Sequence, residues 1–286
     1  MSYVITLIAP HQSPSFDDAA IEILRGAGID IKERVPLCDG IATDLFCAQA
    51  APKALMEKVR EECKIDILCQ QVELRNRRLF FADMDATIVA EETLDELAGH
   101  VGLKDKIAAI TQRAMNGELD FKEALRMRVG LLEGLPESAL ADTAAKVTYN
   151  AGAKDLLAAL KNHGLYCVLV SGGFTYFTQK IADAAGFDEN HGNRLDIANA
   201  TLTGKVLEPI LDKNFKQKCL METAEKLGIP LTETIAIGDG ANDLPMLQTA
   251  GLGIGWRSKP VLREALDNHL LYCNLDVIPF ALGFKA

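Results

Sequence analysis

The chain has 286 residues, of which 49% are hydrophobic and 24% charged, and its formal net charge at pH 7 is -10. These values are typical of a folded globular protein that is long enough for two domains, and they exclude a disordered chain. The negative charge argues against nucleic acid or an anionic membrane as the main partner, because both attract a basic surface.

Cysteine and histidine usage bounds the cellular compartment and the metal chemistry. The seven cysteines form no Cys-x-x-Cys pair, and the five histidines show no paired spacing of metal ligands. We therefore expect reduced thiols and no zinc site. The N-terminal stretch MSYVITLIAP has no basic region, and its apolar run is too short for a signal peptide or a membrane span. A cytoplasmic protein is expected.

Residues 1–76 are predicted to form a small domain of their own. Its predicted strands, which are apolar runs bounded by turn residues, are residues 4–9, 29–35, 41–48 and 65–72. Its predicted helices, which carry an apolar face, are residues 16–27 and 52–63. The order βαββαβ is that of a ferredoxin-like unit and resembles an ACT-type regulatory domain. Ligand binding, a homodimer contact and a purely structural role all stay open, because a fold does not specify a function.

A polar stretch at residues 73–78 predicts the junction with a second domain, residues 77–286. That domain begins with the apolar run 79–82, which is typical of a strand buried on both faces of a parallel sheet. Asp83 and Asp85 follow the run directly. In open α/β sheets, ligands bind beyond the carboxyl ends of the strands, so both carboxylates should face one crevice.

The next fully apolar strand, residues 166–170, comes much later than a simple crossover requires. Residues 90–150 between the two strands show helical spacing of apolar residues, with breaks at Asn116-Gly117 and Gly134-Leu135-Pro136. We therefore predict a helical cap that is inserted after the first core strand and covers the crevice.

Two further strands end in polar residues. Ser171 and Gly172 follow residues 166–170 and precede a predicted helix, a position that suits a phosphate. Asp239 and Asp243 follow the apolar run 234–237. Parallel order places all these ends at one edge of the sheet. The four carboxylates that meet there, those of Asp83, Asp85, Asp239 and Asp243, require a cation. Mg²⁺ is expected, because it binds carboxylate together with phosphate oxygen. A lysine among residues 212–218 would balance the phosphoryl charge.

These motifs together resemble the haloacid dehalogenase superfamily. The matching stretches are DMDATI at 83–88, VSGG at 170–173, the region of Lys216 and GDGAND at 238–243. The stretches EETLDELA at 91–98 and LDFKEALRMRVGLL at 119–132 are similar to the phosphoserine phosphatase family within it. The resemblance covers about residues 78–273. It implies a Rossmann-like core and Mg²⁺-dependent hydrolysis of the small molecule L-phosphoserine through an aspartyl phosphate, the last step of serine biosynthesis.

The resemblance also assigns roles to residues. It implies that Asp83 is the nucleophile, Asp85 the general acid and base, and that Mg²⁺ is held by Asp83, the Asp85 carbonyl and Asp239. The remaining roles it implies are support of the site by Asp243, phosphate binding by Ser171, Gly172 and Lys216, ammonium binding by Glu92, carboxylate binding by Arg128, pocket shape from Met115 and Phe121, and contact with phosphate or water by Asn242.

Ala86 departs from the family pattern, which usually has serine at this position. Two alternatives stay open from the sequence. The protein could be a phosphatase or phosphotransferase of the same superfamily that acts on another phosphorylated metabolite, or an amino-acid sensor whose function resides in residues 1–76.

Overall fold

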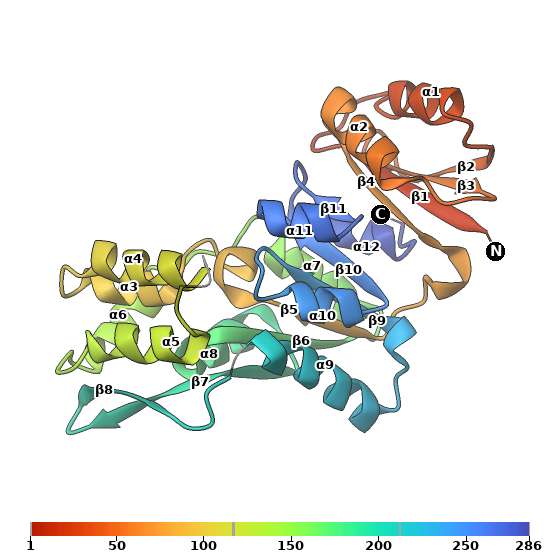
Figure 1. Ribbon diagram of the computed structural model, residues 1–286. Coiled ribbons are helices and arrows are strands. Elements are labelled where there is room, and N and C mark those ends of the chain that lie inside the picture. Colours follow the sequence, from red (N-terminus) through yellow and green to blue (C-terminus); the bar gives the residue numbers. More distant parts are fainter. Residues whose placement is uncertain (1, 116–117, 212, 286) are drawn as a thin grey trace.

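The computed structural model describes residues 2–115, 118–211 and 213–285, whose strands form one mixed sheet (Figure 1). The order of the 11 strands across the sheet is β2-β3-β1-β4-β11-β10-β9-β5-β6-β7-β8. The strands are β1 Tyr3–Ile8, β2 Ile31–Cys38, β3 Ala42–Cys47, β4 Asp66–Gln71, β5 Leu79–Ala82, β6 Tyr166–Phe174, β7 Glu189–Ala198, β8 Thr201–Leu207, β9 Thr234–Gly238, β10 Leu252–Trp256 and β11 His269–Leu270.

Helices connect these strands and cover the sheet. The helices are α1 Asp18–Gly26, α2 Lys53–Cys63, α3 Thr93–Gly99, α4 Lys104–Met115, α5 Phe121–Gly130, α6 Ser138–Ala144, α7 Ala153–Asn162, α8 Thr175–Ala185, α9 Lys213–Leu227, α10 Leu244–Thr249, α11 Pro260–Ala265 and α12 Ile278–Ala281. No helix of the described part of the chain is long and apolar enough to cross a membrane.

Strand β5 lies at the centre of a parallel core. It pairs in parallel with β9 on one side and with β6 on the other. Its four residues are fully buried, and alternate side chains belong to different hydrophobic clusters: Phe80 to the one that includes α7 and α8, and Phe81 to the one that includes α9 and α10. The α/β core with a mainly parallel sheet, predicted from the apolar strand, is confirmed.

The first strands and helices follow one another in the order β1-α1-β2-β3-α2-β4, and their strands pair antiparallel. Helices α1 and α2 share a hydrophobic cluster with these strands. Strand β4 also pairs antiparallel with β11 of the core, through Ile67 and His269. The buried Asp66 carboxylate accepts hydrogen bonds from the backbone N–H groups of Leu271, Tyr272 and Cys273. The sheet therefore continues from the N-terminal unit into the core.

The polar stretch at 73–78 lies between these two parts of the sheet, but it is not a solvated linker. The Arg75 guanidinium donates to both carboxylate oxygens of Asp44, at 2.5 and 2.9 Å, and to the carbonyl oxygens of Phe280 and Ala281. Arg77 is buried and donates to the side chain of Gln70. Arg75, in the stretch that the sequence predicts as a polar junction, thus fastens the C-terminal segment to the N-terminal unit.

Helices α3, α4, α5 and α6 lie between β5 and α7 in the chain and group together beside the core, at the left in Figure 1. Helix α3 contacts α4 and α6, and α5 contacts β8. Strands β7 and β8 form a hairpin that the sequence analysis did not predict. Its tight turn is made by Asn199 and Ala200, both in the left-handed region with φ of 51° and 57°.

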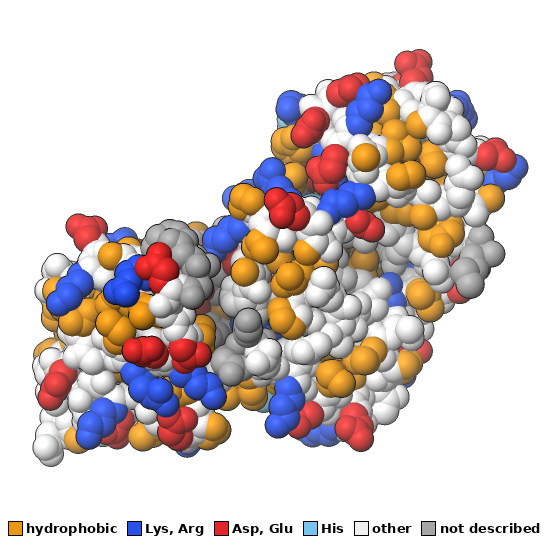
Figure 2. All heavy atoms as spheres, viewed as in Figure 1, with side chains coloured by type: hydrophobic (Ala, Val, Ile, Leu, Met, Phe, Trp, Pro, Cys, Tyr) orange, Lys and Arg blue, Asp and Glu red, His pale blue; other side chains and the backbone are white. Residues whose placement is uncertain are grey.

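Acidic and basic side chains are interspersed over the face of the molecule shown in Figure 2.

The contact of Arg75 with Asp44 generates a stability prediction. We expect Arg75→Ala to lower the free energy of unfolding by about 3 kcal/mol, because it leaves the buried Asp44 carboxylate without its ionic partner. Arg78→Ala is the control, since Arg78 is 51% exposed and pairs with Glu233 at 3.2 Å. It should cost less than about 1 kcal/mol. Urea unfolding followed by circular dichroism measures both values, and equal losses would contradict the structural role of Arg75.

Candidate active site

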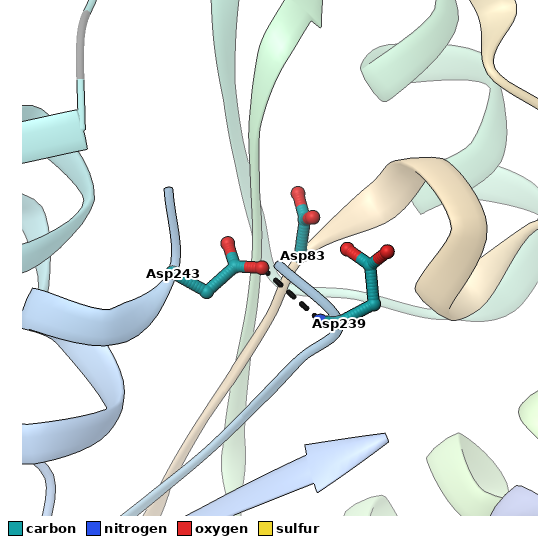
Figure 3. Close-up of side chains that lie close together, drawn as sticks. All are labelled: Asp83, Asp239 and Asp243. Carbon is teal, nitrogen blue, oxygen red and sulfur yellow. Dashed lines mark hydrogen bonds between the residues drawn. The ribbon is translucent and has the colours of Figure 1, made fainter. Parts of the chain in front are cut away.

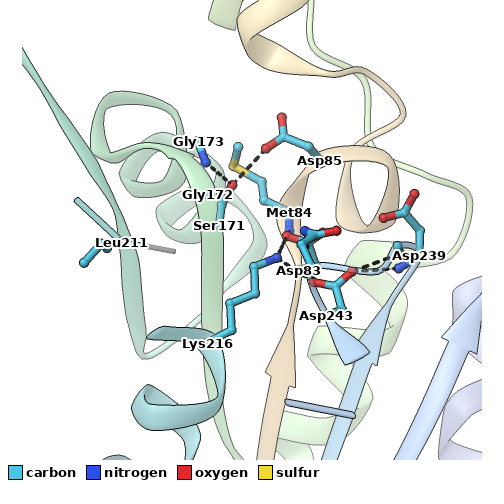
Figure 4. Close-up of polar contacts among 12 residues, drawn as sticks. Asp83, Met84, Asp85, Ser171, Gly172, Gly173, Leu211, Lys216, Asp239 and Asp243 are labelled. Atoms are coloured by element: carbon cyan, nitrogen blue, oxygen red, sulfur yellow. Dashed lines mark hydrogen bonds and ion pairs between the residues drawn. The ribbon is translucent and has the colours of Figure 1, made fainter. Parts of the chain in front are cut away.

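Neighbouring strands of the parallel core bring the predicted motifs together. Asp83 follows β5, Asp239 follows β9, and Ser171 lies near the end of β6. Because β5 lies between β9 and β6, the three residues meet at one edge of the sheet (Figures 3 and 4). Lys216 reaches the same place from the second turn of α9.

Three buried carboxylates crowd at this edge. Asp83, Asp239 and Asp243 each offer one oxygen, and these oxygens all lie within 4.8 Å of one another. Burial and the negative charge of Asp243 raise the pKa of Asp83 well above its usual range. Burial also raises the pKa of Asp239. These carboxylates repel one another when all are ionised, and a divalent cation would relieve that repulsion. Carboxylate oxygens are also the hard ligands that such a cation prefers.

Lys216 supplies a fixed positive charge within the cluster. Its Nζ lies 2.5 Å from Oδ1 of Asp83 and 2.6 Å from Oδ1 of Asp243, and its side chain is 3% exposed. Burial alone would lower the pKa of Lys216, but the charges of Asp243 and Asp83 outweigh it and raise the pKa. The lysine therefore stays protonated and links the two carboxylates.

Asp243 organises the loop after β9. Its Oδ2 accepts the backbone N–H groups of Asp239 and Gly240, both at 3.1 Å. A Cβ at Gly238 would lie only 2.5 Å from the Asp243 carboxyl carbon, so glycine is required for this approach. The Asn242 amide donates to Asp243 at 3.4 Å, which places Asn242 at the rim of the same cluster.

Asp85 is held away from the three clustered carboxylates, toward β6. Its Oδ2 accepts the hydroxyl of Ser171 at 2.8 Å, and its Oδ1 accepts the backbone N–H of Thr93 at 2.8 Å. The Ser171 hydroxyl oxygen in turn accepts the N–H of Gly173 at 2.8 Å. Asp83 and Asp85 therefore lie at the same edge of the sheet in separate positions, each with its own partners (Figure 4).

The predicted substrate contacts come from the helices beside the core. Phe121, at the start of α5, lies against the C-terminal part of β6, because a Cβ at Gly172 would be 3.4 Å from its ring. Arg128, two turns further along the same face of α5, donates to the Thr111 hydroxyl at 3.1 Å and to the Ala124 carbonyl at 3.3 Å. Met115 ends α4, but its side chain lies outside the described part of the structure.

Glu92 directly precedes α3, and the charges of Asp85, Lys259 and Asp239 all act on its carboxyl group. Its side chain remains accessible to solvent, yet the surrounding protein removes enough hydration to raise the pKa of Glu92, and the charge of Asp85 adds to this, giving a value of about 7. The positive charge of Lys259 acts in the opposite direction. Burial lowers the pKa of Arg128, whereas Asp95 and Glu92 act to raise it. Glu92 and Arg128 thus share one electrostatic environment.

Three contacts of the site were missed from the sequence. Lys259 forms an ion pair with Asp239 at 2.9 Å. The Asn193 amide donates to the Gly172 carbonyl at 2.8 Å and its oxygen accepts the N–H of Leu211, so it ties the end of β6 to the segment before α9. The N–H of Thr93 orients Asp85. The N–H of Thr93 could have been anticipated, because the first N–H groups of a helix have no partner within it and α3 begins at Thr93. Lys259 and Asn193 lie in no motif that is recognisable in the sequence.

Comparison with known proteins identifies the family. The model of the haloacid dehalogenase-like hydrolases matches residues 80–248. The chain is 40% identical over 230 residues to the phosphoserine phosphatase SerB2 of Mycobacterium tuberculosis, an alignment that covers 80% of this chain and 56% of that protein. The chain therefore spans little more than half the length of this relative.

Solved structures agree with this assignment. A crystal structure of a HAD family hydrolase from Salmonella enterica serovar Typhi superposes with a TM-score of 0.89 at 29% identity, covering 98% of each chain. A structure described as a phospho-aspartyl intermediate analogue of phosphoserine phosphatase has a TM-score of 0.68 at 37% identity and covers 72% of this chain and 99% of its own. The resemblance inferred from the motifs is confirmed, and the chain belongs to the haloacid dehalogenase-like hydrolases, among the relatives of the phosphoserine phosphatases.

Proposed function

We propose that this protein is a Mg²⁺-dependent phosphatase that hydrolyses L-phosphoserine to L-serine and phosphate. The observation that carries the proposal is the convergence of Asp85, Ser171 and Lys216 on Asp83 and its cluster of buried carboxylates, at one edge of the sheet. The 37% and 40% identities to proteins named as phosphoserine phosphatases support the choice of substrate. This reaction would be the last step of serine biosynthesis.

Asp83 would act as the nucleophile. Its Oδ1 accepts the N–H of Met84 at 2.8 Å and the ammonium of Lys216 at 2.5 Å, whereas its Oδ2 accepts no hydrogen bond from the described residues. The free oxygen would attack phosphorus, form an aspartyl phosphate and release the serine oxygen. The fixed contacts of Oδ1 hold the carboxylate in one orientation for this attack.

Asp85 would move the proton. It would donate a proton to the departing serine oxygen and then accept one from the water that attacks the aspartyl phosphate, which returns both carboxylates to their initial state. Ser171 and the N–H of Thr93 orient Asp85 for both steps. Ser171, Gly172 and Lys216 would bind the phosphoryl oxygens, and Asn242 would contact phosphate or the attacking water.

The residues that would hold Mg²⁺ are Asp83, Asp239 and the carbonyl of Asp85, with Asp243 in support. The supporting role fits Asp243, because its oxygens already accept Lys216 and two backbone N–H groups. When bound, Mg²⁺ would neutralise charge on the carboxylates and on the phosphoryl oxygens.

Substrate selection would come from residues 90–150, which we propose as a cap over the crevice. Glu92 would pair with the substrate ammonium and Arg128 with its carboxylate, while Phe121 and Met115 would shape the pocket. The approach of Phe121 to Gly172 supports the placement of α5 over the end of β6, where Ser171 and Gly172 would bind phosphate. An analogue that lacks either charged group would leave a desolvated charge unpaired.

We also propose that residues 1–76 form an ACT-like domain, separate in sequence from the phosphatase domain at 77–286. The order β1-α1-β2-β3-α2-β4 supports this assignment. A homodimer through this unit and a cytoplasmic location remain predictions from the sequence.

The direct test is phosphate release from L-phosphoserine. We expect turnover with Mg²⁺ and loss of turnover with excess chelator. Asp83→Asn should reduce kcat by about 10⁴-fold or more, since it removes the nucleophilic oxygen.

The same assay on a panel of other phosphorylated metabolites checks the substrate. A higher kcat/KM for a compound without the amino and carboxylate groups would favour a different phosphatase of the family. No turnover of any compound would favour a sensor.

A second prediction concerns Arg128. Arg128→Ala should lower kcat/KM for L-phosphoserine by about 100-fold, because the substrate carboxylate loses its partner, and should change kcat/KM for p-nitrophenyl phosphate by less than about fivefold. Arg126→Ala is the matched control, since Arg126 lies on the same helix but is 54% exposed and pairs with Glu208. Equal losses on the two substrates would argue against a carboxylate-binding role.

A third prediction uses the pKa of Glu92, which is raised to about 7. Only ionised Glu92 can pair with an ammonium, so the ratio of kcat/KM for L-phosphoserine to that for p-nitrophenyl phosphate should increase as the pH rises through this value. Well below it, the ratio should fall by about tenfold per pH unit. In Glu92→Gln the ratio should be lower and independent of pH between 5.5 and 8.5, about the range that brackets the pKa. An unchanged slope in the variant would refute the assignment.

A further inference from the structure

Lys259 contacts the carboxylate cluster from outside the four family motifs. It lies between β10 and α11, and its Nζ is 2.9 Å from Oδ2 of Asp239. Its backbone N–H also donates to the Asp239 carbonyl, at 2.9 Å. The oxygen Oδ1 of Asp239 accepts no hydrogen bond from the residues that the structure describes. Two bonds from one lysine thus fix the backbone and one carboxylate oxygen of Asp239.

The residue that precedes Lys259, Ser258, contacts a buried histidine. The Nε2 of the buried His269 faces the Leu266 carbonyl at 3.0 Å, so this nitrogen carries the proton and Nδ1 is the acceptor. The hydroxyl of Ser258, next to Lys259, therefore donates to Nδ1 at 2.9 Å. Burial lowers the pKa of His269 to about 4, which keeps the ring neutral. The residue before Lys259 is thus anchored by a buried histidine of β11.

The charge of Lys259 is stable at this position. Burial would lower its pKa, but the carboxylates of Asp239, Glu92 and Asp243 act more strongly and raise it. The Lys259 side chain is 41% exposed, whereas that of Asp239 is 10% exposed. Lys259 is therefore a permanent cation beside one proposed metal ligand.

We propose that Lys259 is a positioning residue that occupies Oδ2 of Asp239, so that this carboxylate can offer a metal only Oδ1, and that it thereby favours Mg²⁺ over Ca²⁺. Ca²⁺ takes six to eight oxygens and accepts carboxylates through both oxygens, whereas Mg²⁺ requires a near-ideal octahedron. A carboxylate limited to one oxygen suits the smaller ion. The inference rests on the proposed Mg²⁺ site.

The test compares the binding of two ions of equal charge. Isothermal titration with MgCl₂ and with CaCl₂ gives Kd for each ion on the full-length protein and on Lys259→Met. Loss of a lysine changes the attraction of both dications alike, so the ratio of Kd for Ca²⁺ to Kd for Mg²⁺ isolates the coordination effect. We expect this ratio to fall by about tenfold in Lys259→Met, the scale on which partners of metal ligands tune affinity.

Two variants control the experiment. Lys259→Arg keeps a donor on Oδ2 and should retain a ratio within about threefold of the wild type, by the same scale. Lys58→Met removes an exposed lysine of α2, whose side chain pairs with Glu62 at 3.9 Å, and should leave the ratio unchanged. Thermal unfolding of the metal-free variants establishes that each is folded.

The outcomes separate the two proposals. Mg²⁺ binding with the same ion ratio in wild type and Lys259→Met would overturn the role of Lys259 and leave the proposed function intact. A shift in Lys58→Met as large as that in Lys259→Met would overturn it as well. Absence of Mg²⁺ binding by the wild type would overturn both proposals.

Discussion

Repulsion among buried carboxylates is the constraint on which the site depends. Oxygens of Asp83, Asp239 and Asp243 lie within 4.8 Å of one another in a region with little solvent. Like charges at this separation favour protonation unless positive groups stand between them. Lys216 bridges two of them and Lys259 holds the third. The backbone N–H groups of Asp239 and Gly240 donate to the Asp243 carboxylate and place partial positive charge beside it. The cluster can stay compact because each carboxylate already has a donor.

The parallel sheet explains why such a cluster forms at all. Strand β5 buries side chains on both faces, so its polar residues must follow its last apolar position. Its neighbours β9 and β6 run in the same direction and end beside it. The glycine at 238 then permits Asp243 to approach from the next turn. Packing of the strand faces and convergence of the carboxylates are thus consequences of one topology.

The sequence was sufficient where a local pattern determines the structure. Apolar runs predicted β5, β6 and β9, and their polar ends predicted Asp83, Ser171 and Asp239 as neighbours. It was insufficient where partners come from distant segments. The hairpin β7–β8 has exposed polar positions and no continuous apolar run, and the pairing of Arg75 with Asp44 depends on tertiary contacts. The ion pair of Lys259 with Asp239 also joins distant segments, and no local pattern near Lys259 indicates it.

The alanine at position 86 has a physical interpretation. Its φ of 54° lies in the left-handed region, which costs a non-glycine residue about 1–2 kcal/mol, whether it is alanine or serine. Its backbone N–H donates to the Glu91 carbonyl, which fastens this turn to the segment that leads into α3. The neighbouring Asp85 is oriented by the Thr93 N–H and the Ser171 hydroxyl, not by the side chain at 86. A missing hydroxyl at this position therefore leaves both contacts of the proposed proton carrier in place.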